Sequence, residues 1–341
     1  MMTNQTLKWV LIALFISINN DLRANGIILA NPFLGMWTID IDGGGVGWLE
    51  VHEKNGFLDA DLLWIGGSVL PVAHVYIASD GELVVTRLQE VIKSTNGQGL
   101  ERKHTITNTL RMSVSGDKLE GTMTTPDRQG VGEDKTNFSG KRLPPVGPAP
   151  DLTKVRYDEP VQLFTGNDLS GWKLIDPEHT NGFKAVDGIL VNDPLQPEAG
   201  EHIHYGNLRT ISEFEDFNLQ LEVNVPEGNN SGIYLRGMYE VQVLDSYGED
   251  LNPHHMGAIY SRIAPSVAAE KPAGSWQSLD IILCQRYVTV KLNGKLIIDN
   301  QPLHGPTGGA IISDVFSPGP IYLQGDHGKV SYRNMVLRPI L

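Results

Sequence analysis

The sequence predicts an all-β protein made of two antiparallel domains, a small barrel or sandwich followed by a larger two-sheet sandwich. Short alternating apolar segments separated by turn residues run through residues 31–143 and again through residues 161–341, and amphipathic helical periodicity is almost absent. Between them lies the proline-rich stretch 144–160, in which prolines lack the backbone donors that a strand ladder needs. We therefore expect residues 144–160 to be an extended linker between the two domains.

The composition is that of an acidic globular protein. With 341 residues the chain is long enough for two domains, and a hydrophobic content of 40% can supply a core for each. A net charge of -13 repels polyanions, and no basic patch with interleaved aromatic residues occurs, so nucleic-acid binding is disfavoured. The single cysteine, Cys284, has no partner for a disulfide within the chain and is expected in a core.

The first 24 residues have the pattern of a signal peptide. Lys8 precedes an apolar run from Trp9 to Ile18, and Leu22-Arg23-Ala24 offers a cleavage site. The apolar run is too short to span a bilayer. We therefore expect a secreted or periplasmic protein with no membrane span after cleavage.

The first domain is expected to be an antiparallel meander that closes into a small barrel or sandwich. Turn pairs such as Asn55-Gly56, Asp80-Gly81 and Asn96-Gly97 separate its alternating segments. Its charged residues and histidines are scattered along residues 31–143 and form no catalytic pattern. The sequence leaves the role of this domain open.

The second domain is organised around residues 232–246, two alternating runs joined by a tight corner. Apolar residues fall on one face of these runs, whereas Tyr234, Arg236, Glu240 and Gln242 fall on the other. A carboxylate beside a guanidinium costs free energy to bury unless the two are paired or used. This face is therefore a candidate ligand-binding surface, and a solvated face with an ordinary cross-strand ion pair is the alternative.

A series of motifs runs through the second domain in order. They are Leu163-Phe-Thr-Gly-Asn-Asp-Leu-Ser-Gly-Trp172, Asn230-Ser-Gly-Ile-Tyr-Leu-Arg-Gly237, Tyr239-Glu-Val-Gln-Val-Leu-Asp245, Gly257-Ala-Ile-Tyr260, Gly274-Ser-Trp-Gln277 and Gly319-Pro-Ile-Tyr-Leu-Gln-Gly-Asp-His-Gly328. From about Gln162 to Pro339 the chain resembles the 3-keto-disaccharide hydrolase family. The resemblance implies a concanavalin A-like jelly roll and activity on glycosides whose sugar is oxidised at C3. It does not extend to the first domain.

The strand from Glu240 to Asp245 is also similar to the catalytic strand of laminarinase-type β-glucanases. In those enzymes a β-bulge turns the last carboxylate so that two acids face the cleft. Here Gln242 stands in place of the middle acid, and Asp245 is shorter than the last one. A retaining β-glucanase is therefore disfavoured, although the similarity favours a place on the concave face for this strand.

A ketone at C3 makes the C2 proton acidic, so the glycosidic bond at C1 can break by β-elimination. Such a reaction needs a base at C2 and an acid at the leaving oxygen. We expect Glu240, or a histidine of Pro253-His-His-Met256 such as His255, to be the base. Asp245 or His327 is expected to be the acid.

Other residues are assigned to charge stabilisation and sugar binding. Arg236 and Lys271 are expected to stabilise negative charge on the enolate oxygen. Trp276 offers a flat apolar face for a sugar ring, although a core position is the commoner role for tryptophan in a β-sandwich. The further residues expected to bind substrate are Arg236, Gln242, Tyr260 and Gln324.

His202 and His204 have the i, i+2 spacing of two strand residues on one face. With Glu240 or His255 they could hold a divalent metal ion, the one cofactor that the sequence suggests. Such an ion would polarise the ketone. Two histidines without a metal are the alternative.

These observations favour an exported enzyme that cleaves 3-keto-glycosides, by elimination or by net hydrolysis. A non-catalytic lectin-like jelly roll and a retaining β-glucanase are the alternatives. The chain has no dinucleotide-binding glycine motif after a strand. The resemblance therefore implies a separate oxidoreductase that makes the 3-keto sugar.

Overall fold

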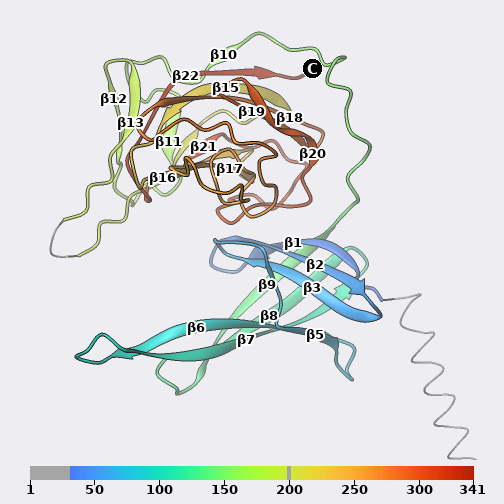
Figure 1. Cartoon of the computed structure of the whole chain (residues 1–341). Coiled ribbons are helices and arrows are strands. Elements are labelled where there is room, and N and C mark those ends of the chain that lie inside the picture. Colours follow the sequence, from blue (N-terminus) through green and yellow to red (C-terminus); the bar gives the residue numbers. More distant parts are fainter. Residues whose placement is uncertain (1–30, 198–200) are drawn as a thin grey trace, which may run out of the picture.

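The computed structural model describes residues 31–197 and 201–341, and the segment expected to be a signal peptide, residues 1–24, lies outside them. Every regular element in this part of the chain is a β-strand (Figure 1). The described residues include no helix able to cross a membrane. The predicted all-β fold is therefore confirmed.

The first half of the chain forms one antiparallel sheet of nine strands. They are β1 (Gly35–Ile41), β2 (Val46–Lys54), β3 (Phe57–Trp64), β4 (Leu70–Pro71), β5 (His74–Ile77), β6 (Leu83–Thr95), β7 (Glu101–Ser115), β8 (Lys118–Pro126) and β9 (Glu133–Leu143). Their order in the sheet is β4-β3-β2-β1-β9-β8-β7-β6-β5. Val72 N donates to Ala60 O in β3, and Ala73 N donates to Thr86 O in β6, so the sheet curls back on itself.

Alternation along these strands builds the core of the first sheet. Trp37, Ile39 and Ile41 of β1 point inward at period two, and Leu110 and Met112 of β7 face them from the same interior. The long β6–β7 hairpin extends away from the second half of the molecule (Figure 1).

Two further sheets form a sandwich in the second half. Their strands are β10 (Val161–Gln162), β11 (Trp172–Leu174), β12 (Phe183–Val186), β13 (Ile189–Asn192), β14 (Leu208–Thr210), β15 (Phe217–Asn224), β16 (Asn230–Leu235), β17 (Tyr239–Leu244), β18 (Trp276–Cys284), β19 (Tyr287–Leu292), β20 (Lys295–Pro302), β21 (Tyr322–Leu323) and β22 (Val330–Pro339). One sheet has the order β12-β13-β22-β15-β18-β19-β20, with β10 beside β22, and the other has the order β11-β14-β21-β16-β17.

The core of the sandwich lies between its two sheets. Leu219 and Leu221 of β15 reach it from the eight-stranded sheet, and Ile233, Leu235 and Val241 reach it from the five-stranded sheet. The apolar face of the β16–β17 hairpin is thereby used for packing. Its polar face is left for the outer side of the five-stranded sheet.

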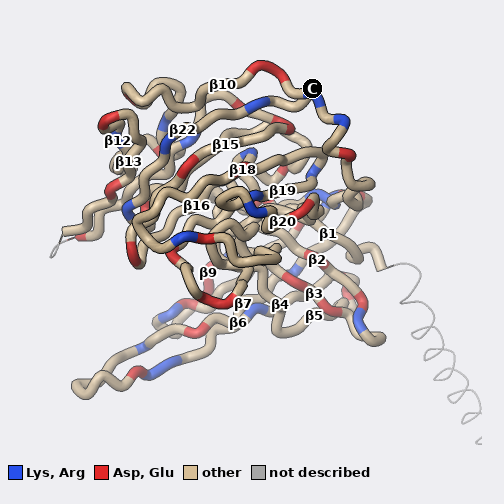
Figure 2. The backbone as a smooth tube through the Cα atoms, turned by 45° about the horizontal axis from the view of Figure 1, so that its top comes forward, with Lys and Arg blue, Asp and Glu red and all other residues tan. Residues whose placement is uncertain are grey.

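The two halves are joined by a shared core and an anchored connection. Trp48 and Leu63 of the first sheet are buried in the same cluster as the sandwich core. The Trp48 Nε1 group donates to His304 O at 3.1 Å. Between β9 and β10 the connection is pinned to the sandwich by the Tyr287 hydroxyl, which donates to Gly147 O at 2.7 Å. Acidic and basic positions are interspersed over both halves (Figure 2).

Candidate active site

The candidate site is built on the β16–β17 hairpin. In its regular antiparallel register Tyr234 pairs with Glu240, and Gly232 pairs with Gln242, so these residues share one face of the sheet. A Cβ atom on Gly232 would collide with the Glu240 carboxylate. Glycine at this position therefore leaves the space that the carboxylate occupies.

A cavity of about 500 Å³ lies over this face, which is within the usual range for a small-molecule site. Its walls come from the hairpin, the chain segments beside β17 and β21, the Gly308-Gly309 turn, and Gly66 and Gly67 of the first sheet. The polar residues that line it are Asn230, Tyr234, Glu240, Gln242, His254, Tyr260, Gln324 and His327.

Glu240 is buried in this wall, with 4% of its surface exposed. The Tyr234 hydroxyl donates to Glu240 Oε2 at 2.7 Å, and the Tyr234 ring stacks on Tyr322 with 3.9 Å between centroids. Burial raises the pKa of Glu240 to about 7, while the Tyr234 hydrogen bond and the charge of His327 act in the opposite direction. A carboxylate with this pKa can accept and release a proton near neutral pH.

His327 is another titratable group of the cavity, and it is paired with its neighbour Asp326. Asp326 Oδ1 lies 2.6 Å from His327 Nδ1. The hydrogen bond to Asp326 and the negative charge of that residue raise the pKa of His327, against the effect of burial. Burial alone would raise the pKa of Asp326, but the hydrogen bond and charge of His327 lower it. The Asp326 contact thus favours the protonated form of His327, which lines the same cavity as Glu240.

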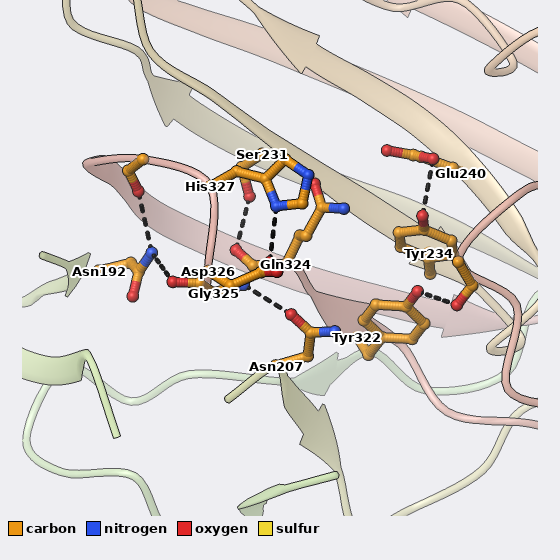
Figure 3. A network of polar contacts seen from close by, with 12 residues as sticks. Asn192, Asn207, Ser231, Tyr234, Glu240, Tyr322, Gln324, Gly325, Asp326 and His327 are labelled. Carbon is orange, nitrogen blue, oxygen red and sulfur yellow. Dashed lines mark hydrogen bonds and ion pairs between the residues drawn. The ribbon is translucent and has the colours of Figure 1, made fainter. Parts of the chain in front are cut away.

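The loop that carries His327 is fixed by hydrogen bonds between its backbone and side chains of two other segments (Figure 3). Asn192 Nδ2 donates to both Gly325 O and Gly328 O at 3.0 Å. Gly325 N donates to Asn207 Oδ1 at 2.8 Å. These bonds hold the loop in one position before any ligand binds, which favours catalysis.

Comparison with known families identifies the second half of the chain. The family described as the 3-keto-alpha-glucoside-1,2-lyase-like domain matches residues 159–338. The chain belongs to this family. The resemblance of the second half of the sequence is confirmed, and the lyase-like domain of this chain is the sandwich that carries Glu240.

Solved structures with similar folds were also found, and no curated protein sequence matches the chain. A protein of Parabacteroides distasonis, provisionally named a glycosyl hydrolase, is 26% identical, with 58% of this chain and 94% of that chain covered and a TM-score of 0.43. The endo-beta-1,3(4)-glucanase SCLam is 13% identical, with coverage of 57% and 86% and a TM-score of 0.31. The carbohydrate-binding module CBM66 of Bacillus subtilis is 16% identical, with coverage of 48% and 93% and a TM-score of 0.28.

Five of the residues expected in the site line the cavity of the lyase-like domain. They are Glu240, Gln242, Tyr260, Gln324 and His327. Four come from β17 or the loop after β21, and Tyr260 comes from the segment that pairs beside β17 through Tyr260 N and Glu240 O. Strand alternation, the motif Gly257-Ala-Ile-Tyr260 and the motif after β21 were the signals that pointed to them.

Arg236 does not reach this cavity, contrary to the expectation. It follows the end of β16 with a φ of 54°, so strand alternation no longer fixes the direction of its side chain. Its guanidinium is buried and donates to the backbone carbonyls of Val315 and Ser317. Arg236 therefore holds a loop of the lyase-like domain.

Asp245 and His255 also lie elsewhere. The β16–β17 register contains no bulge, so nothing turns Asp245 toward Glu240, and its Oδ2 accepts from Gly228 N at 3.0 Å. His255 Nε2 lies 3.1 Å from Glu249 Oε2 and lines a different cavity, of about 440 Å³. Its neighbour His254 is the histidine that lines the Glu240 cavity.

Trp276 begins β18 in the other sheet of the sandwich, and Lys271 lies in the loop before that strand. Lys271 Nζ donates to Trp276 O at 3.0 Å, and the Arg333 guanidinium lies 4.0 Å above the Trp276 ring. Neither residue lines the Glu240 cavity, because β18 pairs with β15 in the eight-stranded sheet. The structure therefore does not bring them together with the proposed base.

The two histidines considered as metal ligands lie close to each other. The rings of His202 and His204 are 5.4 Å apart, and His204 stacks on His179 at 6.0 Å. Neither lines the cavity that holds Glu240. A metal ion at these histidines stays a prediction.

A different group in the first sheet has the geometry of a metal site. Within the described residues, ligand atoms of Glu50, His52 and Asp61 lie within 4.8 Å of one another. These half-buried residues lie on β2 and β3 and do not line the Glu240 cavity. This group is therefore not part of the candidate site.

Two contributions to the cavity were not foreseen. Tyr234 was placed on the polar face but given no partner, whereas the register sets it opposite Glu240. Gly66 and Gly67 come from the first sheet, more than 150 positions before the hairpin. The Gly66-Gly67-Ser68 turn was visible in the sequence, but nothing there indicated which part of the second half it would meet.

Proposed function

We propose that the protein cleaves the glycosidic bond of 3-keto-glycosides by taking a proton from C2 and eliminating the group at C1. The family to which the chain belongs is described by a lyase that acts on a 3-keto-alpha-glucoside. That description supports a sugar with a ketone at C3 as the substrate class. The cavity over β16 and β17 is proposed as the place where the sugar binds.

The observation that carries the proposal is the single carboxylate of the cavity. Among the described residues that line it, Glu240 is the one acid, and His327 is the titratable group whose charge acts on it. Retaining and inverting glycosidases use two carboxylates, about 5 to 9.5 Å apart. One carboxylate with a pKa of about 7 beside a histidine suits proton transfer at carbon better than it suits that chemistry.

In the proposed reaction the Glu240 carboxylate takes the C2 proton of the 3-keto sugar. The electron pair of the C2–H bond forms the enolate of C2 and C3. When the C3 ketone re-forms, these electrons make the C1–C2 double bond. The C1–O bond breaks, and its electron pair leaves with the aglycone oxygen, which takes a proton from the His327 imidazolium. The products are a 3-keto-glycal with a hydroxyl at C2 and an alcohol, and addition of water to the glycal would complete a net hydrolysis.

The developing enolate needs donors, and the cavity offers neutral ones. The amide groups of Gln242 and Gln324 line the same space as Glu240. We assign them to the enolate oxygen, in place of Arg236 and Lys271. Tyr234 stays protonated because burial and the nearby Glu240 charge raise its pKa well above the ordinary value. It is therefore a donor to Glu240 and not a second base.

The sequence supports two further proposals, one on the source of the substrate and one on the location of the protein. The ketone is made by a separate oxidoreductase, because this chain has no glycine motif for a dinucleotide. Residues 1–24 direct the protein out of the cytoplasm. Cell fractionation and mass spectrometry of the mature N-terminus would test the second point.

The test is incubation of the pure protein with a 3-keto-disaccharide and, separately, with its unoxidised parent. Cleavage of the ketone alone is expected, and addition of a chelator shows whether a metal ion is needed. Cleavage of the parent would instead favour a β-glucanase, and binding without cleavage of either would favour a lectin-like protein.

The matched variants are Glu240→Gln and Glu249→Gln. The first removes the proposed base, so the rate of ketone cleavage should fall at least about a hundredfold. The second removes an acid from the His255 cavity and should leave the rate within about twofold. Equal activity of both variants would remove Glu240 from the mechanism.

A further inference from the structure

We propose that the first β-sheet is part of the sugar site, and that Ser68 is a positioning residue that holds His254 in the wall of the cavity. The proposal rests on the proposed function of the Glu240 cavity and adds to it residues outside the segment that matches the family. Gly66 and Gly67, which precede Ser68, line the cavity directly. Ser68 continues the same turn and reaches His254.

The hydrogen bonds fix which nitrogen of His254 carries the proton. His254 N donates to Asn252 Oδ1 at 2.9 Å, which identifies that atom as the amide oxygen. His254 Nδ1 lies 2.9 Å from the same oxygen, so Nδ1 must carry a hydrogen. Nε2 is then the acceptor in the neutral ring, and the Ser68 hydroxyl, at 2.8 Å, donates to it.

Both nitrogens of His254 are therefore held by the protein, one from each half of the molecule. The His254 ring also packs edge-on against Tyr260, with 4.9 Å between centroids. Both rings line the cavity together with Glu240 and His327. Loss of the Ser68 bond would free the His254 ring to rotate and would change the shape of this wall.

The turn that carries Ser68 has little freedom to move away from the sandwich. A Cβ atom on Gly308 would collide with the backbone of Gly66 and Gly67, so the two turns meet backbone to backbone. Val69 N, directly after Ser68, donates to Ser261 Oγ at 2.9 Å.

A second contact between the halves lies farther from the cavity. The Arg262 guanidinium lies 4.4 Å above the Trp48 ring and donates to Pro306 O. Together with the shared core, these contacts dock the first sheet rigidly. Its turn can thus act as a fixed wall.

The first test measures the tautomer of the His254 ring in the absence of sugar. In the full-length protein labelled with ¹⁵N-histidine, NMR at a pH where imidazole rings are neutral should show the hydrogen of His254 on Nδ1. Ser68→Ala should broaden this signal or mix the two tautomers, and Ser68→Thr, which keeps the hydroxyl, should restore it. An unchanged His254 spectrum in Ser68→Ala would overturn the role of Ser68.

The second test measures the kinetic constants for the sugar substrate. On a 3-keto-disaccharide, Ser68→Ala should raise KM about fivefold to tenfold, the effect of about one lost hydrogen bond, and leave kcat within about twofold. Ser94→Ala, an exposed serine on β6, is the matched control and should leave both constants unchanged. An unchanged KM in Ser68→Ala would contradict the proposal.

Binding to the inactive Glu240→Gln variant separates the failure of this inference from the failure of the proposed function. Added 3-keto-disaccharide should shift the backbone NMR signals of Gly66 and Gly67 together with those of Tyr260 and Gln324. Shifts at Tyr260 and Gln324 without shifts at the two glycines would exclude the first sheet from the site. Absence of shifts at all four would overturn the proposed function itself.

Discussion

Glu240 is kept near the midpoint of its titration at neutral pH by its surroundings. Burial raises its pKa from the ordinary 4.5 to about 7. Between these values the unfolded chain loses this proton before the folded chain does, so the free energy of unfolding falls as the pH rises from 4.5 to 7. The charged carboxylate thus costs about 3 kcal/mol above pH 7. Glu240→Gln should therefore unfold at the same or a higher temperature than the wild type at pH 8.

A change at Tyr234 should move the pH profile of cleavage. In the wild type, kcat/KM is expected to rise with pH through about 7 as Glu240 loses its proton. Tyr234→Phe removes a hydrogen bond to the charged form of Glu240, so the pKa of that residue should rise further and the ascending limb should shift to higher pH. Measurement of kcat/KM from pH 5 to 9 tests this, and a shift to lower pH would contradict it.

Single residues were predictable where the backbone is regular. Alternation set Tyr234, Glu240 and Gln242 on one face, and the register bears this out. Alternation failed for Arg236, because a residue with positive φ at a strand end does not continue the pattern. For the adjacent His254 and His255, the sequence carries no signal for which ring turns to which side.

Within the β16–β17 hairpin, the space beside Glu240 depends on a missing side chain. Gly232→Ala would place a Cβ atom against the Glu240 carboxylate and push it from its bond with Tyr234. We expect kcat/KM for a 3-keto-glycoside to fall about tenfold or more, since small displacements of a catalytic group are costly. Gly97→Ala is the control, because its Cβ would meet no atom within 4 Å. Equal kinetics for the two variants would contradict this account of the hairpin.

The strands were more predictable than the contacts between the first sheet and the sandwich. Turn pairs and alternating runs indicated the strands of both halves, because these signals are local. The contact between the Gly66-Gly67 turn and Gly308 depends instead on how two sheets dock. Docking is decided by surface shape over many strands, which no short motif encodes.

Across the whole molecule, the shared core should make the two halves unfold together. Trp48 is buried in the cluster that fills the sandwich, and a tryptophan-to-alanine change in a core costs about 3 to 5 kcal/mol. We expect one calorimetric transition for the wild type. Trp48→Ala should lower its temperature, separate it into two transitions and raise KM. Two transitions in the wild type would show that the halves are independent.

The interior common to Trp48, Leu63 and the sandwich also limits how such a protein can be rearranged by recombination. A domain whose apolar surface is covered by its own residues can be exchanged between unrelated genes. Here a sandwich moved without the first sheet would expose the apolar surface that Trp48 and Leu63 cover. The two halves of this chain are therefore expected to be engineered as a single unit.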